Sequence, residues 1–75
     1  MGANKFKVGD IVWAVLIDRV VLKAKIEKIS FSETRNVLYF CRYFDGGVGY
    51  VPEEELFRSE MDAGYEVEKR NENKH

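Results

Sequence analysis

The sequence contains few of the residues that usually carry catalysis or covalent cross-links. One cysteine, Cys41, and one histidine, His75, occur in 75 residues. A single cysteine excludes an internal disulfide, and its place inside an apolar run indicates a buried, reduced thiol. The histidine is the last residue and Cys41 has no histidine partner, so neither supports nucleophilic or acid–base catalysis. We therefore expect no enzymatic activity.

Long hydrophobic runs, metal-binding patterns and phosphate-binding loops are also missing. The longest apolar run, 11–17, is far too short to cross a bilayer, and no signal-peptide pattern is present. The glycines at 46–49 lack the Lys-Ser/Thr pair of a P-loop. The acidic run 53–55 has no nearby histidine or cysteine and no calcium-loop spacing. We expect a soluble, monomeric, intracellular protein, cytoplasmic or nuclear, with no metal, cofactor or membrane partner.

The net charge is small, but the charged residues are unevenly distributed along the chain. The net charge is −1. Residues 1–28 carry six basic and three acidic side chains, whereas residues 29–75 carry six basic and ten acidic ones. A protein that contacts many phosphates is usually strongly basic. The first part of this chain therefore offers only a small basic face.

The composition is that of one small globular domain. Hydrophobic residues make up 45% of the chain and charged residues 33%, and the length is near the lower limit for independent folding. We expect a lead-in over residues 1–7, a β domain over 8–58, and a short helix with a frayed tail over 59–75. The helix is expected from about residue 60 to 70, with Ser59 as its N-cap.

Two strands are expected in the first half of the chain. The run 11–17 is rich in β-branched and aromatic residues and apolar at both parities, which is typical of a strand buried on one face and partly covered on the other. Over 20–29, apolar residues alternate with lysine and glutamate. Because Ile29 falls out of this alternation, a β-bulge or bend is expected near Lys28.

A polar hairpin loop over 30–36 precedes a third strand over 37–44. One face of this strand carries Val37, Tyr39, Cys41 and Tyr43. The other face carries Leu38, Phe40, Arg42 and Phe44. Arginine is seldom buried without a partner, so the face with Arg42 is expected to be the outer one.

The glycine-rich stretch after the third strand predicts a sharp reversal. The residues at 45–47 are a strong hairpin-turn signal, because glycine supplies positive φ without strain. Gly49 indicates a bulge or a close approach of another backbone. Pro52 ends the fourth strand, 53–55 is expected to form one helical turn, and 56–57 re-enters the core.

These four or five antiparallel strands, with one helical turn before the last and a short C-terminal helix, predict a mostly β fold, a small SH3-like barrel. The segment GDIVWA at 9–14 resembles the opening strand of PWWP and Tudor domains, and AKI at 24–26 the end of their second strand. RYFDG at 42–46 is similar to their third strand, and VPEEELF at 51–57 to their closing turn and last strand. The resemblance covers 8–57 and points to the royal superfamily. Similar short barrels also occur in small bacterial and phage proteins of unassigned role.

The resemblance implies an aromatic cage that attracts a methylated ammonium. PWWP-like cage positions fall here on Arg19, Leu22 and Tyr43. Further positions, by comparison with Tudor domains, fall on Leu16, Phe40 and Asp45. Only one residue in each set is aromatic. One or two rings do not surround an ammonium, so we do not expect methyl-lysine reading.

Two binding hypotheses follow, and each competes with a purely structural explanation. The preferred one is a non-catalytic module that binds a peptide or protein partner through Phe40, Tyr43, Phe44, Asp45 and Tyr50. These rings around the glycine turn also fit core packing in a small barrel. The alternative is nucleic-acid binding through Lys23, Lys25, Lys28 and Arg42, with a ring beside them for stacking. Lysines on exposed strands also serve solubility. A structural or host-interaction role in a bacterium or phage is a third possibility.

Overall fold

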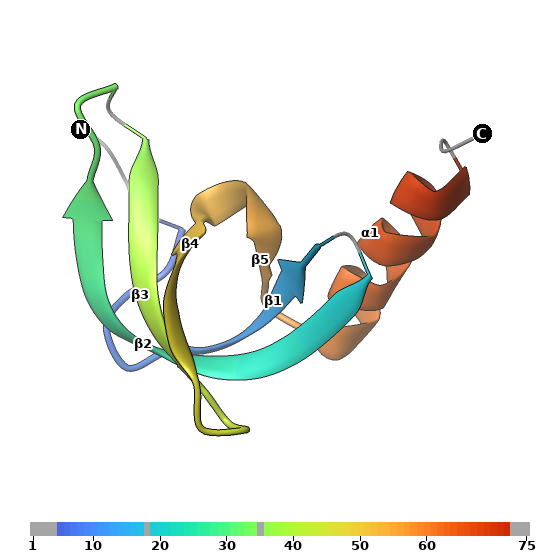
Figure 1. Ribbon diagram of the computed structural model, residues 1–75, viewed down its shortest axis with the longest axis horizontal. Helices are drawn as coiled ribbons and strands as arrows, with labels where there is room; N and C mark the ends of the chain where they lie inside the picture. The colour runs from blue at the N-terminus through green and yellow to red at the C-terminus, as the bar shows by residue number, and fades with distance from the viewer. Residues whose placement is uncertain (1–4, 18, 35, 73–75) are drawn as a thin grey trace.

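The fold is mostly β, with one antiparallel sheet and a C-terminal helix, as the sequence predicts (Figure 1). The computed structural model describes residues 5–17, 19–34 and 36–72. The sheet has the strand order β4-β3-β2-β1-β5. Its five strands are β1 (Ile11–Leu16), β2 (Val20–Phe31), β3 (Val37–Tyr43), β4 (Val48–Pro52) and β5 (Leu56–Phe57). A single 3-10 turn, η1 (Glu53–Glu55), joins β4 to β5, and α1 (Glu60–Glu72) follows.

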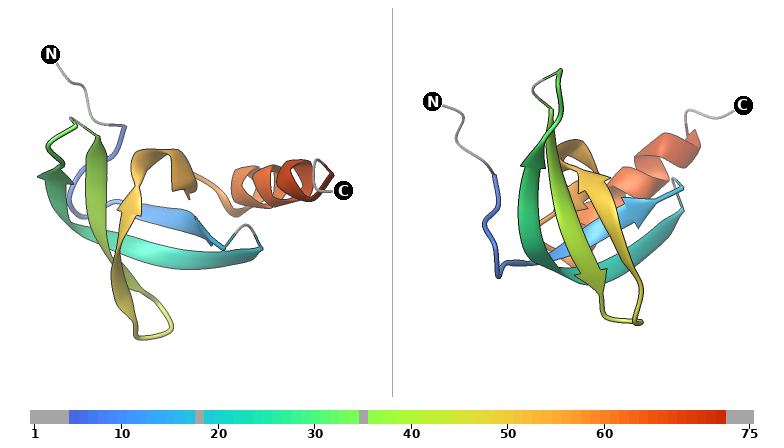
Figure 2. Two further views of the ribbon diagram at one scale, coloured as in Figure 1. Left: turned by 45° about the horizontal axis from the view of Figure 1, so that its top comes forward. Right: turned by 60° about the vertical axis from the view of Figure 1, so that its left-hand side comes forward.

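The long strand β2 gives the sheet its curvature. Figures 1 and 2 show β2 bending along its length, with β3 and β4 at one end and β1 and β5 at the other. The ladder between β2 and β3 shifts register between Ile26 and Lys28, which confirms the predicted bulge. After the shift, Ile29 lies opposite Tyr39 and Lys28 opposite Phe40. The bulge therefore returns Ile29 to the inner face and keeps Lys28 on the outer one.

The core lies on the inner, concave side of this sheet. Its buried members come from every strand and from the segment before β1, namely Phe6, Val12, Ala14, Ala24, Ile26, Tyr39, Cys41, Val51 and Leu56. Leu16, Ile29, Val37 and Tyr43 pack against it. The expected alternation along β3 is confirmed, because Tyr39 and Cys41 are buried and Arg42 is exposed. Phe6 was expected only as part of a lead-in over residues 1–7, yet its side chain belongs to the core. Residues 1–4 of this lead-in lie outside the described part of the chain.

The helix covers part of the opposite face. α1 contacts β1, β2 and β5. Val12 and Ala14 point into the core, so Val15 points to the other side of β1, yet its side chain is buried. Ala63 of α1 is buried as well. This packing explains why the first strand is apolar at both parities.

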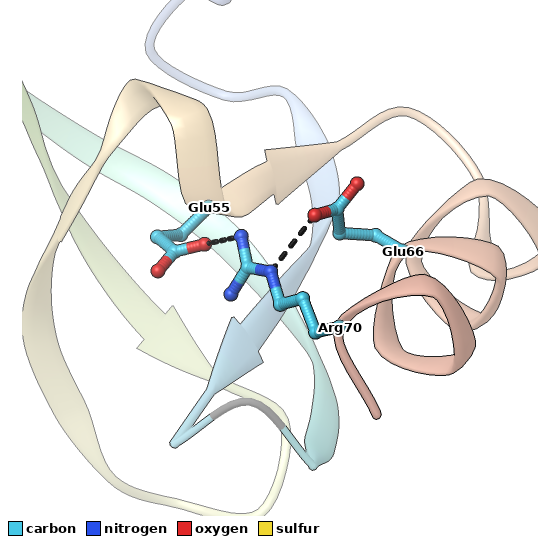
Figure 3. A network of polar contacts seen from close by, with 3 residues as sticks. All are labelled: Glu55, Glu66 and Arg70. Carbon is cyan, nitrogen blue, oxygen red and sulfur yellow. Dashed lines mark hydrogen bonds and ion pairs between the residues drawn. The ribbon is translucent and has the colours of Figure 1, made fainter. Parts of the chain in front are cut away.

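Polar contacts fix both ends of α1. The N–H of Asp62 donates to Oγ of Ser59 at 3.1 Å, which confirms the predicted cap. Near the other end, Arg70 donates to Glu66 on the same helix at 2.8 Å and to Glu55 of η1 (Figure 3). The helix extends two residues past the expected end, and residues 73–75, expected to form a tail, lie outside the described residues.

The turn between β3 and β4 forms as the glycines predict. Gly46 has φ of +108°, and the carboxylate of Asp45 accepts a hydrogen bond from the N–H of Gly47 at 3.2 Å. Gly49 differs from expectation, because it pairs with Cys41 in a regular ladder. A Cβ at this position would lie 3.1 Å from the hydroxyl of Tyr43. Gly49 therefore makes room for a side chain rather than for a bulge or another backbone.

Two further observations complete the description of the chain. The loop expected over 30–36 is shorter, because Ser30 and Phe31 pair with β3 as the end of β2. Within the described residues, no helix has the length and apolar character needed to cross a membrane.

Candidate functional site

Rings and basic side chains alternate on the outer face of the sheet, which we define as the side opposite the core. Strand parity and pairing assign to it Trp13, Lys23, Lys25, Lys28, Phe40, Arg42, Phe44 and Tyr50. Phe44 and Tyr50 are 61% and 56% exposed, which is unusual for large rings. An exposed surface that combines rings with cations is chemically suited to polyanions and to planar groups.

One row on this face places a lysine between two rings. Trp13 of β1 lies opposite Lys23 of β2, and the N–H of Phe44 donates to the carbonyl oxygen of Lys23 at 2.9 Å. The ammonium of Lys23 lies 5.7 Å from the ring centroid of Trp13 and 4.9 Å from that of Phe44. Both contacts are within the range of cation–π attraction. The row is therefore an arranged group and not three independent surface residues.

The remaining basic residues extend from this row along β2 and β3. Lys25 lies opposite Arg42. Arg42 donates two hydrogen bonds to Glu27, at 3.0 and 3.2 Å, and this contact lowers the pKa of Glu27 below its ordinary value. Lys28 lies opposite Phe40 because of the bulge. The outer face thus carries four cations and one acid that is already paired.

A second ring pair lies at the β4 end of the face. Phe40 and Tyr50 are cross-strand partners with ring centroids 5.0 Å apart, tilted by 52°. Val48, two residues before Tyr50, is 48% exposed. Cross-strand ring pairs of this kind stabilise a sheet, and the exposure of Tyr50 leaves part of the pair's ring surface open to a ligand.

The residues of the predicted peptide site do not all lie together. Phe40, Phe44 and Tyr50 share the outer face, whereas Tyr43 lies on the inner face against the core. Asp45 is engaged in the turn through Gly47. All four residues of the predicted nucleic-acid site share the outer face.

The inner face holds a polar network under the N-terminal segment. The buried hydroxyl of Tyr39 donates to Glu53 at 2.6 Å and accepts from the N–H of Phe6 at 3.3 Å. The N–H of Lys5 donates to the same Glu53 oxygen at 3.0 Å. Burial, followed by the bond to Glu53, raises the pKa of Tyr39 to about 12, and the bond from Tyr39 lowers the pKa of Glu53. Burial raises the pKa of Cys41 to about 11, so its thiol stays protonated near neutrality.

Other sites in the described residues offer less chemistry. No group of three His, Cys, Asp or Glu side chains is placed to hold a metal in this part of the chain. A cavity of about 180 Å³ lies between the N-terminal segment, β5 and the start of α1. Its lining residues are Lys5, Phe6, Leu56, Phe57, Arg58 and Asp62.

Trp13 lies on the outer face and is not among the site residues expected from the sequence. The alternation along β1 carries the correct signal, because Trp13 lies between Val12 and Ala14, which both point inward. Its partner across β5 is Phe57. What the sequence alone does not reveal is that Lys23 and Phe44 are its neighbours, since this depends on the register of three strands.

Comparison with known proteins identifies no family for this chain: no family model matches it, and neither a curated protein nor a solved structure matches it.

Proposed function

We propose that this chain is a non-catalytic binding module whose outer face binds single-stranded nucleic acid. The observation that supports this most strongly is the shared exposure of four cations and several rings on one face of the sheet. Cations attract the phosphate backbone, and every base has a face that stacks on a ring. The preference expected from sequence, a peptide site that includes Tyr43, is less well supported because that ring packs against the core.

The charge distribution restricts where a strand would lie. Residues 53–72, which form η1, β5 and α1, carry eight acidic and three basic side chains. This acidic end repels phosphates, whereas Lys23, Lys25 and Lys28 on β2 attract them. A single strand would therefore follow the cations of β2 and β3 and avoid α1.

Binding to a labelled oligothymidylate, measured by fluorescence anisotropy at increasing salt, tests the proposal. With three or four phosphate contacts, the slope of log affinity against log salt is expected to be about −2 to −3. Replacing Lys25 and Lys28 with glutamate should weaken binding at least about tenfold and make the slope shallower by about 1.4, the contribution of two phosphate contacts.

The control is Lys69→Glu, which reverses one exposed charge on α1 and none of the four cations on β2 and β3. This variant should bind with nearly unchanged affinity. Flat anisotropy curves for both single-stranded and double-stranded DNA at low salt would contradict the proposal.

We also infer that the curled sheet is an SH3-like barrel of the Tudor/PWWP type. The strand order and the 3-10 turn before the last strand support this inference. In such a barrel the outer face of β2, β3 and β4 is a continuous platform. The incomplete aromatic cage remains a reason not to propose methyl-lysine reading.

A peptide or protein partner is a second candidate, favoured by the free edge of β4. The N–H of Tyr43 donates to the carbonyl of Gly47 at 2.7 Å, so these two residues form a hydrogen-bonded pair. From there along the hairpin, hydrogen-bonded and non-hydrogen-bonded residue pairs alternate, as in any antiparallel ladder. This alternation directs the N–H and C=O groups of Val48 and Tyr50 away from β3. An extended peptide could pair with this edge, beside the rings of Phe40 and Tyr50.

Selection of binders from a display library of random peptides, followed by NMR shift mapping, separates this candidate from the first. Edge pairing predicts shifts at Val48 and Tyr50, and loss of binding when the peptide backbone is N-methylated. Shifts confined to α1 and β5 would speak against it.

A further inference from the structure

We propose that Trp13 and Phe44 form a base-stacking subsite that Lys23 occupies in the free protein and leaves when a base enters. This inference rests on the proposed binding of single-stranded nucleic acid and adds the position and the order of contacts. It concerns three residues in one row across β1, β2 and the end of β3.

The geometry of the row supports a two-ring site. One ammonium lies over both rings, at 5.7 Å from the Trp13 centroid and 4.9 Å from the Phe44 centroid. The two rings therefore flank one volume above the sheet, and the end of the Lys23 side chain fills it. Phe44 is 61% exposed, so this volume is open to solvent and to a ligand.

The residues next to this row restrict which ligands fit the subsite. Phe57 lies beyond Trp13 on β5, and Lys25 follows Lys23 on the same face of β2. Within the sheet, the row thus has a ring on one side and a cation on the other, which complements a planar base attached to a phosphate. A cationic ligand would meet both Lys23 and Lys25 and is disfavoured by charge.

Entry of a base allows Lys23 to exchange one partner for another. The exposed cation–π contacts of its ammonium are weak, and stacking of a base on a ring replaces them. The released ammonium remains within a flexible side chain's reach of the phosphate next to that base. The same lysine thus occupies the subsite in the free state and contributes a phosphate contact in the bound state.

The single tryptophan of the chain makes the exchange directly observable. We expect oligothymidylate to quench Trp13 emission in parallel with the anisotropy of the labelled oligonucleotide. An abasic oligonucleotide of equal length carries the same phosphates, so it should bind more weakly and leave Trp13 emission unchanged. Phe44→Leu, which keeps an apolar side chain but removes the ring, should weaken oligothymidylate binding about tenfold.

Two controls separate this subsite from general effects. Phe31→Leu removes another exposed ring, 64% exposed at the far end of β2, and should leave affinity unchanged. Lys25→Ala and Lys23→Ala should each make the slope of log affinity against log salt shallower by about 0.7, the contribution of one phosphate contact. Lys23→Ala should lose less affinity than Lys25→Ala. In the Lys23→Ala variant the subsite between Trp13 and Phe44 is already empty, so a base can enter without displacing a side chain.

The possible outcomes distinguish the two proposals. Binding without any change in Trp13 emission, together with full affinity of Phe44→Leu, would overturn the subsite and leave the nucleic-acid function standing. Absence of binding to any oligonucleotide at low salt would remove both.

Discussion

Replacing Phe6 with alanine is expected to lower the free energy of unfolding by about 3–5 kcal/mol, the usual cost of removing a buried ring. Phe6 is 2% exposed and packs edge-on against Tyr39, with ring centroids 5.6 Å apart. The guanidinium of Arg58 lies over the Phe6 ring, 5.0 Å from its centroid. For a domain of this size, whose total stability is about 4–11 kcal/mol, the loss is a large fraction of the whole.

Urea unfolding followed by circular dichroism measures this effect. The matched control is Phe31→Ala, which removes an exposed ring from β2 and should change stability by less than about 1 kcal/mol. Equal midpoints for Phe6→Ala and the unmodified protein would show that the N-terminal segment does not belong to the core. The unfolding midpoint of Phe6→Leu should lie between those of Phe6→Ala and the unmodified protein, because leucine keeps most of the apolar contact.

Replacing Tyr39 with phenylalanine is expected to cost about 1.5–3 kcal/mol at neutral pH, the range for a hydrogen bond to a charged group. The change removes one oxygen, and with it the 2.6 Å bond to Glu53 and the acceptor for the N–H of Phe6. Both partners then lose a bond under the N-terminal segment. Urea unfolding of the two proteins at the same pH measures the difference.

The pH dependence of this difference follows from the two pKa shifts. The pKa of Glu53 is lowered in the folded protein, chiefly by Tyr39, so its contribution is present above the unfolded pKa of about 4.3 and lost as pH falls through the folded value. The pKa of Tyr39 is raised from 10.0 to about 12, so its contribution is complete below pH 10 and lost as pH rises toward 12. The difference in free energy of unfolding between the unmodified protein and Tyr39→Phe should therefore be largest at neutral pH and should decrease toward both acid and alkaline pH.

Glu53→Gln provides the matched control for the acid side. The amide oxygen can still accept from Tyr39 and from the N–H of Lys5, so most of the stability at neutral pH should remain. The decline toward acid pH that Glu53 contributes should disappear. A constant difference between Tyr39→Phe and the unmodified protein from acid to alkaline pH would contradict this account of the network.

Much of the sheet could be predicted because inward and outward residues alternate along β3 and the first part of β2. The parity of β3 correctly separates Tyr39 and Cys41 from Arg42, and the misplaced Ile29 correctly indicates the bulge. Asp45 and Gly46 predict their turn because few residues adopt positive φ. These signals are local, so a single sequence is enough to read them.

The parts that could not be predicted depend on long-range pairing. Phe6 is one ring in a polar segment without periodicity, and only the fold brings it to Tyr39. Whether Lys23 meets Trp13 and Phe44 depends on the register of three strands. Tyr43 was grouped with the outer rings because of its neighbours in sequence, although the parity of β3 already placed it with Cys41.

The two faces of the sheet differ in how far their residues can be substituted during evolution. Rings that hold the fold together lie inside, whereas Phe44 and Tyr50 lie outside with more than half of their surface in water. Substitution of the mostly exposed Phe44 is therefore expected to cost less stability than substitution of an interior ring, so this part of the outer side can vary in sequence while the interior stays the same.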